Sequence, residues 1–146
     1  MGQLQKFKQD YILLVEAGFI AVNQTDEDSA VKLFKAAALL DPSNLLPKIG
    51  MGYIHLVKLE LKQAVKVFEE VLAIDPQNDT AKTFLGISLS LNPAEGAKGE
   101  KVLEESAKNS KDPMVKNLAV TALDFVEKFV KKAPSPAQIQ GAPKPK

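Results

Sequence analysis

The segments AVKLFKAAALLDP (residues 30–42) and AVKVFEEVLAIDP (residues 64–76) decide how this chain folds. Each segment starts with alanine, has phenylalanine at its fifth position and ends in Asp-Pro. Proline disfavours helical conformation at the residue before it, so each Asp-Pro is expected to end a helix. The second segment follows the first at a fixed interval in the numbering (64 − 30 = 34). Identical residues at one fixed interval indicate an internal repeat with that period.

Glycine recurs with the same period outside these segments. Gly18, Gly52 and Gly86 are each separated by one period and lie inside predicted helices. A glycine inside a helix costs about 1 kcal/mol relative to alanine. A cost that recurs at fixed spacing indicates that another helix approaches closely at each glycine, and Ala30 and Ala64 fit the same explanation on the paired helix.

The repeat predicts an all-α fold of three helix pairs. Side chains that can cap the next helix follow each Asp-Pro, namely Ser43 or Asn44 and later Asn78 or Asp79. Paired helices are expected at residues 11–24 with 28–40, and 44–58 with 61–74, and further helices at 80–91 and 114–132.

The third repeat departs from the first two. A longer turn at residues 92–96 interrupts it, and Gly99, Leu103 and Ser106 form a shifted set of small, large and small residues. We expect one domain over residues 1–132, with repeats at about 11–43, 44–78 and 79–112 and a capping helix at 113–132. Residues 133–146 contain four prolines and no aromatic residue, so a disordered tail is expected there.

The capping helix is expected to cover the last open face of the array, because a stack of repeats otherwise ends on exposed apolar surface. Its apolar residues recur at helical spacing and form one stripe. The stripe consists of Leu118, Ala122, Phe125, Val126, Phe129 and Val130.

The composition excludes several kinds of function. The chain has no cysteine and one histidine, His55, and all of its 19 cationic residues are lysines, so no catalytic, metal-binding or cofactor-binding constellation is predicted. A formal net charge of +1 disfavours nucleic acid as the main partner. The polar N-terminus and the absence of a long apolar run predict neither a signal peptide nor a membrane span, so a cytoplasmic protein is expected. The acidic residues 26–28 are expected to cap a helix rather than bind calcium.

The spacing of glycine, alanine, phenylalanine and proline resembles that of tetratricopeptide repeats. This resemblance implies a superhelix of three helix pairs plus a C-terminal capping helix, in which the first helix of each pair lines a concave groove. Positions 2, 5, 9, 12 and 13 of the family's first helix point into that groove. Carried over to this chain, they are Ile12, Val15, Phe19, Val22, Asn23, Leu46, Ile49, Tyr53, Leu56, Val57, Thr80, Thr83, Ile87, Ser90 and Leu91.

These fifteen residues are mostly apolar and none is charged. A groove that clamps acidic peptide ends would present lysine or arginine, so this chain is not expected to be a carboxylate clamp. An apolar groove instead suits an amphipathic helix, which lays its i, i+3, i+4, i+7 face against it. Alternatively, the chain's own N-terminal segment or a second copy of the chain in a homodimer covers the groove. The sequence leaves two alternatives for residues 3–10, which either extend the first helix or pack into the groove.

A sharper resemblance rests on Glu-Ala-Gly-Phe at residues 16–19, Ala-Leu-Leu-Asp-Pro at 38–42 and Gly-Met-Gly-Tyr at 50–53. Together they resemble the small bacterial type III secretion chaperones with three tetratricopeptide repeats, and most of all those for the needle subunit. The resemblance implies that the groove holds the C-terminal amphipathic helix of a needle subunit. It also implies that a small helical co-chaperone binds near the first repeats and that the subunit is thereby kept monomeric.

Two other functions remain open from the sequence. A chaperone for the hydrophobic translocator proteins of the same system would bind extended peptides in the same groove. A scaffold that joins two globular proteins would use the outer faces of the repeats instead. An enzyme is not expected.

Overall fold

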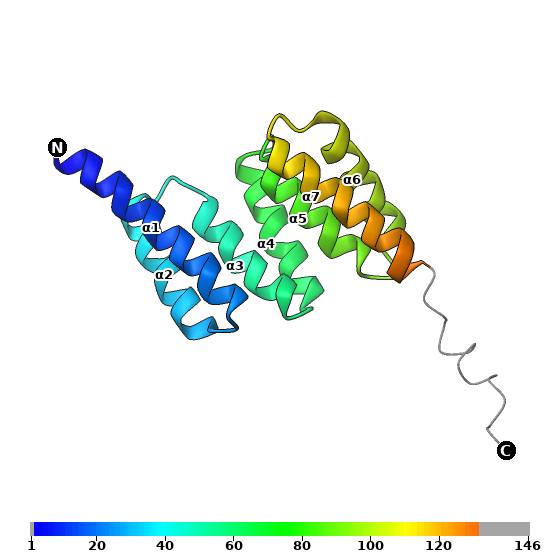
Figure 1. Ribbon diagram of the computed structural model, residues 1–146, viewed down its shortest axis with the longest axis horizontal. Helices are drawn as coiled ribbons and strands as arrows, with labels where there is room; N and C mark the ends of the chain where they lie inside the picture. The colour runs from blue at the N-terminus through cyan, green and yellow to red at the C-terminus, as the bar shows by residue number, and fades with distance from the viewer. Residues whose placement is uncertain (1, 132–146) are drawn as a thin grey trace, which may run out of the picture.

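The computed structural model describes residues 2–131, and within them helices joined by turns make up the chain, without a β-strand (Figure 1). The all-α prediction is therefore confirmed. The helices are α1 (Gln3–Asn23), α2 (Glu27–Leu40), α3 (Leu46–Val57), α4 (Leu61–Ile74), α5 (Asp79–Ser90), α6 (Gly96–Asn109) and α7 (Pro113–Phe125), followed by a π-helix, η1 (Val126–Val130). The predicted and observed bounds of α2 to α5 differ by at most two residues, and those of α4 coincide.

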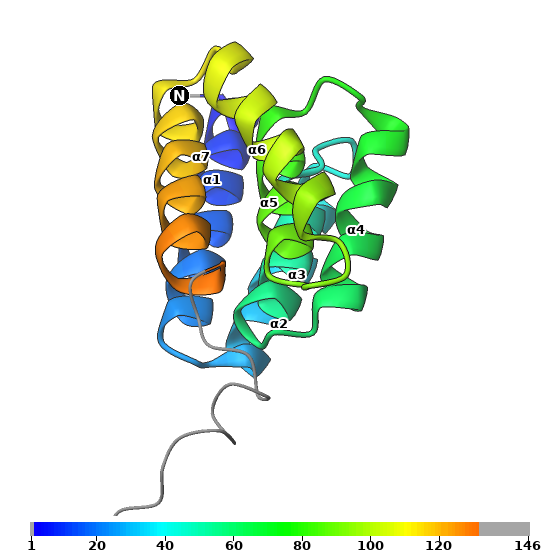
Figure 2. The same cartoon turned by 90° about the vertical axis from the view of Figure 1, so that its right-hand side faces the viewer.

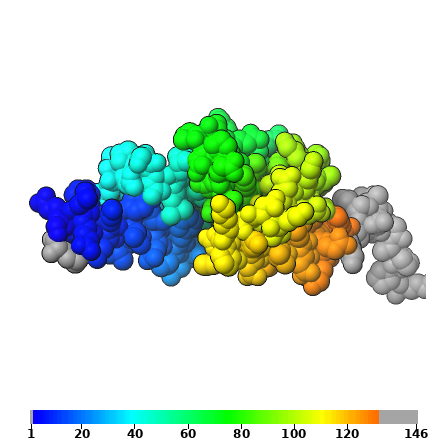
Figure 3. Space-filling model, turned by 90° about the horizontal axis from the view of Figure 1, so that it is seen from above, coloured from blue at the N-terminus to red at the C-terminus, as the bar shows by residue number. Residues whose placement is uncertain are grey.

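The helices form two layers. α1 packs on α2, α3 on α4 and α5 on α6, so the three predicted pairs are present. α1, α3, α5 and α7 also contact one another in succession, and we call them the first layer. The second layer, α2, α4 and α6, packs on the first. The array is elongated, with α1 at one end and η1 at the other (Figure 3), and α1 and α7 lie on the side opposite α4 (Figure 2).

Glycine allows the layers to approach each other in the first two pairs. A methyl group added at Gly18 would lie 2.5 Å from Cε1 of the Phe34 ring, and one at Gly52 would lie 2.6 Å from Cε1 of Phe68. Gly50 of α3 faces the same Phe34 ring, so this ring is held between two first-layer helices. Both rings are fully buried. The close approach predicted from the recurring glycines is confirmed.

The third pair uses smaller residues. Gly99, Leu103 and Ser106 are all buried on α6, as the shifted register predicted. A methyl group added at Gly99 would collide with the backbone nitrogen of Ser90, and one at Gly86 would lie 2.9 Å from Cγ of Leu103. The backbones of α5 and α6 therefore meet almost directly.

The turns inside the first two pairs repeat in detail. Thr25 and Leu59, one repeat period apart, have left-handed backbones with φ of 61° and 58°. In the first turn the Asp26 N–H donates to the Ala21 carbonyl at 2.9 Å. In the second turn the Glu60 N–H donates to the His55 carbonyl, also at 2.9 Å. The period seen in the side chains therefore also holds for the backbone.

Both ends of the domain differ from the sequence prediction. α1 begins at Gln3, and the exposed residues 3–10 extend this helix instead of packing over the first layer. The alternative that they cover the groove is therefore wrong. At the other end α7 gives way to the wider η1 turn, in which the Lys131 N–H donates to the Val126 carbonyl at 3.0 Å. The predicted disordered tail at 133–146 lies outside the described residues.

The apolar stripe expected on the last helix is only partly covered. Val126 is buried, and Leu118, Ala122 and Val130 are half-buried. Phe125 and Phe129 are exposed, with ring centroids 5.1 Å apart. The expectation that the whole stripe packs onto the preceding repeat is therefore wrong for these two rings.

Candidate partner-binding surface

The structure divides the predicted groove residues by their position in the repeat. Those at positions 5 and 12 are all buried, because these positions face the neighbouring helices, and the four apolar ones join the core clusters. They contribute to the core, which corrects the expectation that they line an open groove. The buried residues are Val15, Val22, Ile49, Leu56, Thr83 and Ser90.

Positions 2, 9 and 13 remain accessible in every repeat. They come from α1, α3 and α5, carry no charge, and are apolar with the exceptions of Asn23 and Thr80. We call them the first-layer face. It consists of Ile12, Phe19, Asn23, Leu46, Tyr53, Val57, Thr80, Ile87 and Leu91, each exposed or half-buried.

Aromatic rings join this face to the core. The Phe19 ring packs edge-on against the Phe34 ring, with ring centroids 5.1 Å apart. The centroid of the Tyr53 ring lies 5.7 Å from that of Phe19 and 5.4 Å from that of Phe84. The Tyr53 hydroxyl donates to Asn23 Oδ1 at 2.9 Å and ties α3 to the end of α1. Contacts on both sides hold Phe19 and Tyr53 in position, so this part of the face is organised before any partner binds.

A hollow of about 310 Å³ lies at the edge of the face, between the α1–α2 turn and the end of α3. Apolar groups from Val22, Ile54 and Val57 line it, and Glu27 and Lys58 stand at its rim. Its size and lining suit one apolar side chain of a partner.

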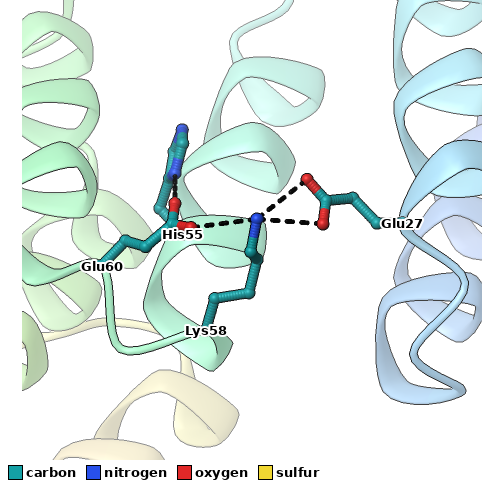
Figure 4. Close-up of polar contacts among 4 residues, drawn as sticks. All are labelled: Glu27, His55, Lys58 and Glu60. Atoms are coloured by element: carbon teal, nitrogen blue, oxygen red, sulfur yellow. Dashed lines mark hydrogen bonds and ion pairs between the residues drawn. The ribbon is translucent and has the colours of Figure 1, made fainter.

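Four charged or titratable side chains join the first repeat to the second at this rim (Figure 4). The Lys58 ammonium lies 3.0 Å from a Glu27 oxygen and 2.9 Å from Glu60 Oε1, and His55 Nδ1 lies 2.6 Å from Glu60 Oε2. The hydrogen bonds from His55 and then Lys58 lower the pKa of Glu60, and those to Glu60 and Glu27 raise the pKa of Lys58. These side chains are 32–49% exposed, so the network is expected to add little to stability.

The single histidine is thus engaged in hydrogen bonding. Within residues 2–131, no group of three or more histidine and acidic side chains is arranged to hold a metal ion. None of the helices described is both long enough and apolar enough to cross a membrane. Comparisons with protein-family models, curated proteins and solved structures give no match.

Sequence reasoning placed Phe125 in the apolar stripe of the capping helix and did not single out Met114, and both residues are accessible on α7. Pro113 follows Pro76 at an interval longer than the repeat period. The proline positions therefore did not place α7 in register with α5. The N-cap residues of α5 and α7, Asn78 and Asp112, are separated by one repeat period and do place the two helices in register.

Proposed function

We propose that this chain is a tetratricopeptide-repeat chaperone of bacterial type III secretion. In this proposal the first layer forms the concave side of a superhelix and binds an amphipathic helix of the needle subunit in the bacterial cytoplasm. The observation that carries the proposal is the first-layer face, which presents apolar side chains from three successive helices without a charge among them.

The face has the chemistry that this task requires. A needle subunit polymerises through apolar helix surfaces, so a chaperone that covers its amphipathic helix also blocks assembly. Phe19 and Tyr53 offer large, fixed apolar contacts, and aromatic residues of this kind dominate many protein interfaces. The hollow lined by Val57 adds a pocket for one side chain of the bound helix.

A second surface supports the co-chaperone part of the proposal. The extension of α1 past the end of α2 exposes Leu4 and Phe7, and a hollow of about 520 Å³ lies between it and the end of α2. Tyr11 lines this hollow, and its buried hydroxyl has no hydrogen-bond partner among the described residues. A small helical co-chaperone at this end would cover the exposed Leu4 and Phe7 side chains.

Co-expression tests the proposal. The full chain is produced with the needle subunit of the same secretion system, and the complex is isolated through a tag on the chain. Val57→Asp and Tyr53→Asp place a charge on the first-layer face and should abolish co-purification, because an unpaired charge would be buried in the complex. The matched control is Leu39→Asp, at an exposed apolar residue of the second layer.

The outcomes separate the candidate functions. Loss of the subunit with both face variants and retention with Leu39→Asp supports the proposal, provided that circular dichroism shows unchanged helix content. Retention of a translocator protein in place of the needle subunit would favour the second chaperone class. Loss of binding only with Leu39→Asp would favour a scaffold that uses the second layer.

A further inference from the structure

The two buried positions of the first-layer helices become polar at α5. In α1 and α3 they hold aliphatic residues, namely Val15, Val22, Ile49 and Leu56. In α5 they hold Thr83 and Ser90, whose hydroxyls donate to carbonyls of α5 itself at 2.9 Å and 2.7 Å. These hydrogen bonds do not depend on α6 or α7, so both residues can face water without leaving a polar group unpaired.

Helix α6 offers little apolar surface to hold the third pair together. Its large apolar residues are Val102 and Leu103, and it contains two glycines, Gly96 and Gly99, which lower helix stability relative to alanine. The three apolar core clusters described for residues 2–131 are built from α1 to α5, and none includes a residue of α6 or α7. Few apolar contacts and weak helix propensity are typical of a segment that opens before the rest of a protein.

Helix α5 shares its core with the second repeat. Ala81 belongs to the same core cluster as Phe68, and the Phe84 ring stacks on the Phe68 ring with centroids 5.6 Å apart. Helix α7 packs on α6, and the Lys131 ammonium, just after η1, lies 2.7 Å from a Glu100 oxygen of α6. The core therefore changes between α5 and α6, and the helices after this point are tied to one another.

We propose that the domain consists of two cooperative units, and that α6, α7 and η1 open together while α1 to α5 remain folded. In the open state α5 ends the array, with Thr83 and Ser90 facing water, as a terminal helix requires. The first-layer face of α1, α3 and α5 stays in place. This inference goes beyond the proposed function and does not depend on it.

Opening at this boundary costs less than opening within either of the first two pairs. It exposes Leu103, which packs against Gly86, and breaks the hydrogen bond from the Ser110 hydroxyl to Asp79 Oδ2 at 3.0 Å. Water can replace this hydrogen bond. Separating either of the first two pairs would instead expose a fully buried phenylalanine ring, which has more apolar area than a leucine.

Hydrogen exchange of the full chain, resolved by residue with NMR, tests the proposal. Amides of α6 and α7 should exchange about tenfold or more faster than the slowest amides of α3 to α5, after correction for intrinsic rates. Low concentrations of urea should accelerate the α6 and α7 amides less than the slowest ones, because the partial opening exposes less surface than global unfolding. Equal protection and equal urea dependence in α4, α5 and α6 would contradict the proposal.

Two variants determine whether the opening is separate from global unfolding. Phe34→Leu changes the unit α1 to α5, so it should accelerate the slowest amides of α3 and α4 by about tenfold and those of α6 and α7 by less than about twofold. Gly99→Ala destabilises the native state relative to both the open and the unfolded states, so it should accelerate both groups by about tenfold or more.

The pattern of the two variants decides the outcome. An equal effect of Phe34→Leu on both groups would overturn the proposal, since the domain would then unfold as one unit. Amides of α5 that follow those of α6 in both variants would also overturn it, because the boundary would not lie between α5 and α6.

Discussion

The first two helix pairs and the third pair have the same spacing but are packed by different means. In the first two pairs a ring from the second layer, Phe34 or Phe68, fills the space left by a first-layer glycine. In the third pair Gly99 lies against the backbone at Ser90, and no ring separates the helices. Helix pairs with the same repeat length can therefore pack in two ways. A ring can fill the space between the two helices, or the two helix backbones can approach each other directly. The choice also shapes the partner face, which is aromatic at Phe19 and Tyr53 and aliphatic at Ile87 and Leu91.

The largest expected effect follows from removing a ring. Phe34→Ala should lower the free energy of unfolding by about 4 kcal/mol, because a cavity opens between α1, α2 and α3. Leu103→Ala, the equivalent change in the third pair, should cost about 3 kcal/mol. Urea denaturation followed by circular dichroism measures both. A larger cost for Leu103→Ala would contradict the view that the first two pairs depend on their rings.

The opposite change tests the third pair. Gly99→Ala should lower the free energy of unfolding by about 2–3 kcal/mol, since the new methyl group meets the backbone of α5. Gly86→Ala should cost less, about 1 kcal/mol, because the new methyl group meets side-chain atoms of Leu103 rather than backbone and alanine favours a helix. Similar costs for the two variants would show that α5 and α6 can separate without penalty.

A smaller and stabilising effect is expected at the start of the first pair. Tyr11→Phe removes a buried, unpartnered hydroxyl and should raise the free energy of unfolding by about 1 kcal/mol at neutral pH. Burial, followed by the nearby Asp41 charge, raises the pKa of Tyr11 to about 12 from 10.0. The folded chain therefore disfavours the ionised hydroxyl relative to the neutral one, so its stability is constant below pH 10.0 and falls as the pH rises toward about 12.

The alkaline titration gives this prediction its control. The unsubstituted chain should lose stability over that pH range, and Tyr11→Phe should lose less. Tyr53→Phe changes the other tyrosine and keeps Tyr11 in place, so it should retain the alkaline loss. Equal pH profiles for Tyr11→Phe and the unsubstituted chain would contradict the burial of the Tyr11 hydroxyl.

The smallest effect concerns the exposed network between the first two repeats. The hydrogen bonds from His55 and Lys58 lower the pKa of Glu60, so its carboxylate favours the folded state above its unfolded pKa. This contribution is lost as the pH falls through the folded pKa. Glu60→Gln should therefore make the loss of stability between about pH 5 and about pH 3 shallower. Glu69→Gln, at an exposed residue of α4, is the control, and an equal change in both variants would contradict a specific role for the network.

The sequence was sufficient where a feature repeats along the chain. The repeat period located α2 to α5, the glycine contacts with Phe34 and Phe68, and the shifted set around Leu103. It was insufficient where neighbours decide exposure. Val15 and Ile12 are both apolar and three residues apart, yet the first is in the core and the second is exposed, because only one faces the adjoining helix.

The ends of the array were predicted least well. A terminal helix lacks one neighbour, so its apolar residues can serve the core or a partner, and the pattern alone cannot distinguish these roles. Phe125 and Phe129 belong to the stripe of the helix expected to cover the last open face of the array, although both are exposed. At the other end, the sequence left open whether residues 3–10 extend the first helix or pack into the groove, and the structure shows the extension.

Site-specific photocrosslinking tests the central claim most directly, because it reports which layer touches the needle subunit. A photoreactive residue is placed at Val57 on the first layer or at Leu39 on the second, and each chain is co-expressed with the subunit. We predict a crosslink from position 57 to the amphipathic helix of the subunit and none from position 39. A crosslink from position 39 alone would contradict the assignment of the first-layer face as the binding surface.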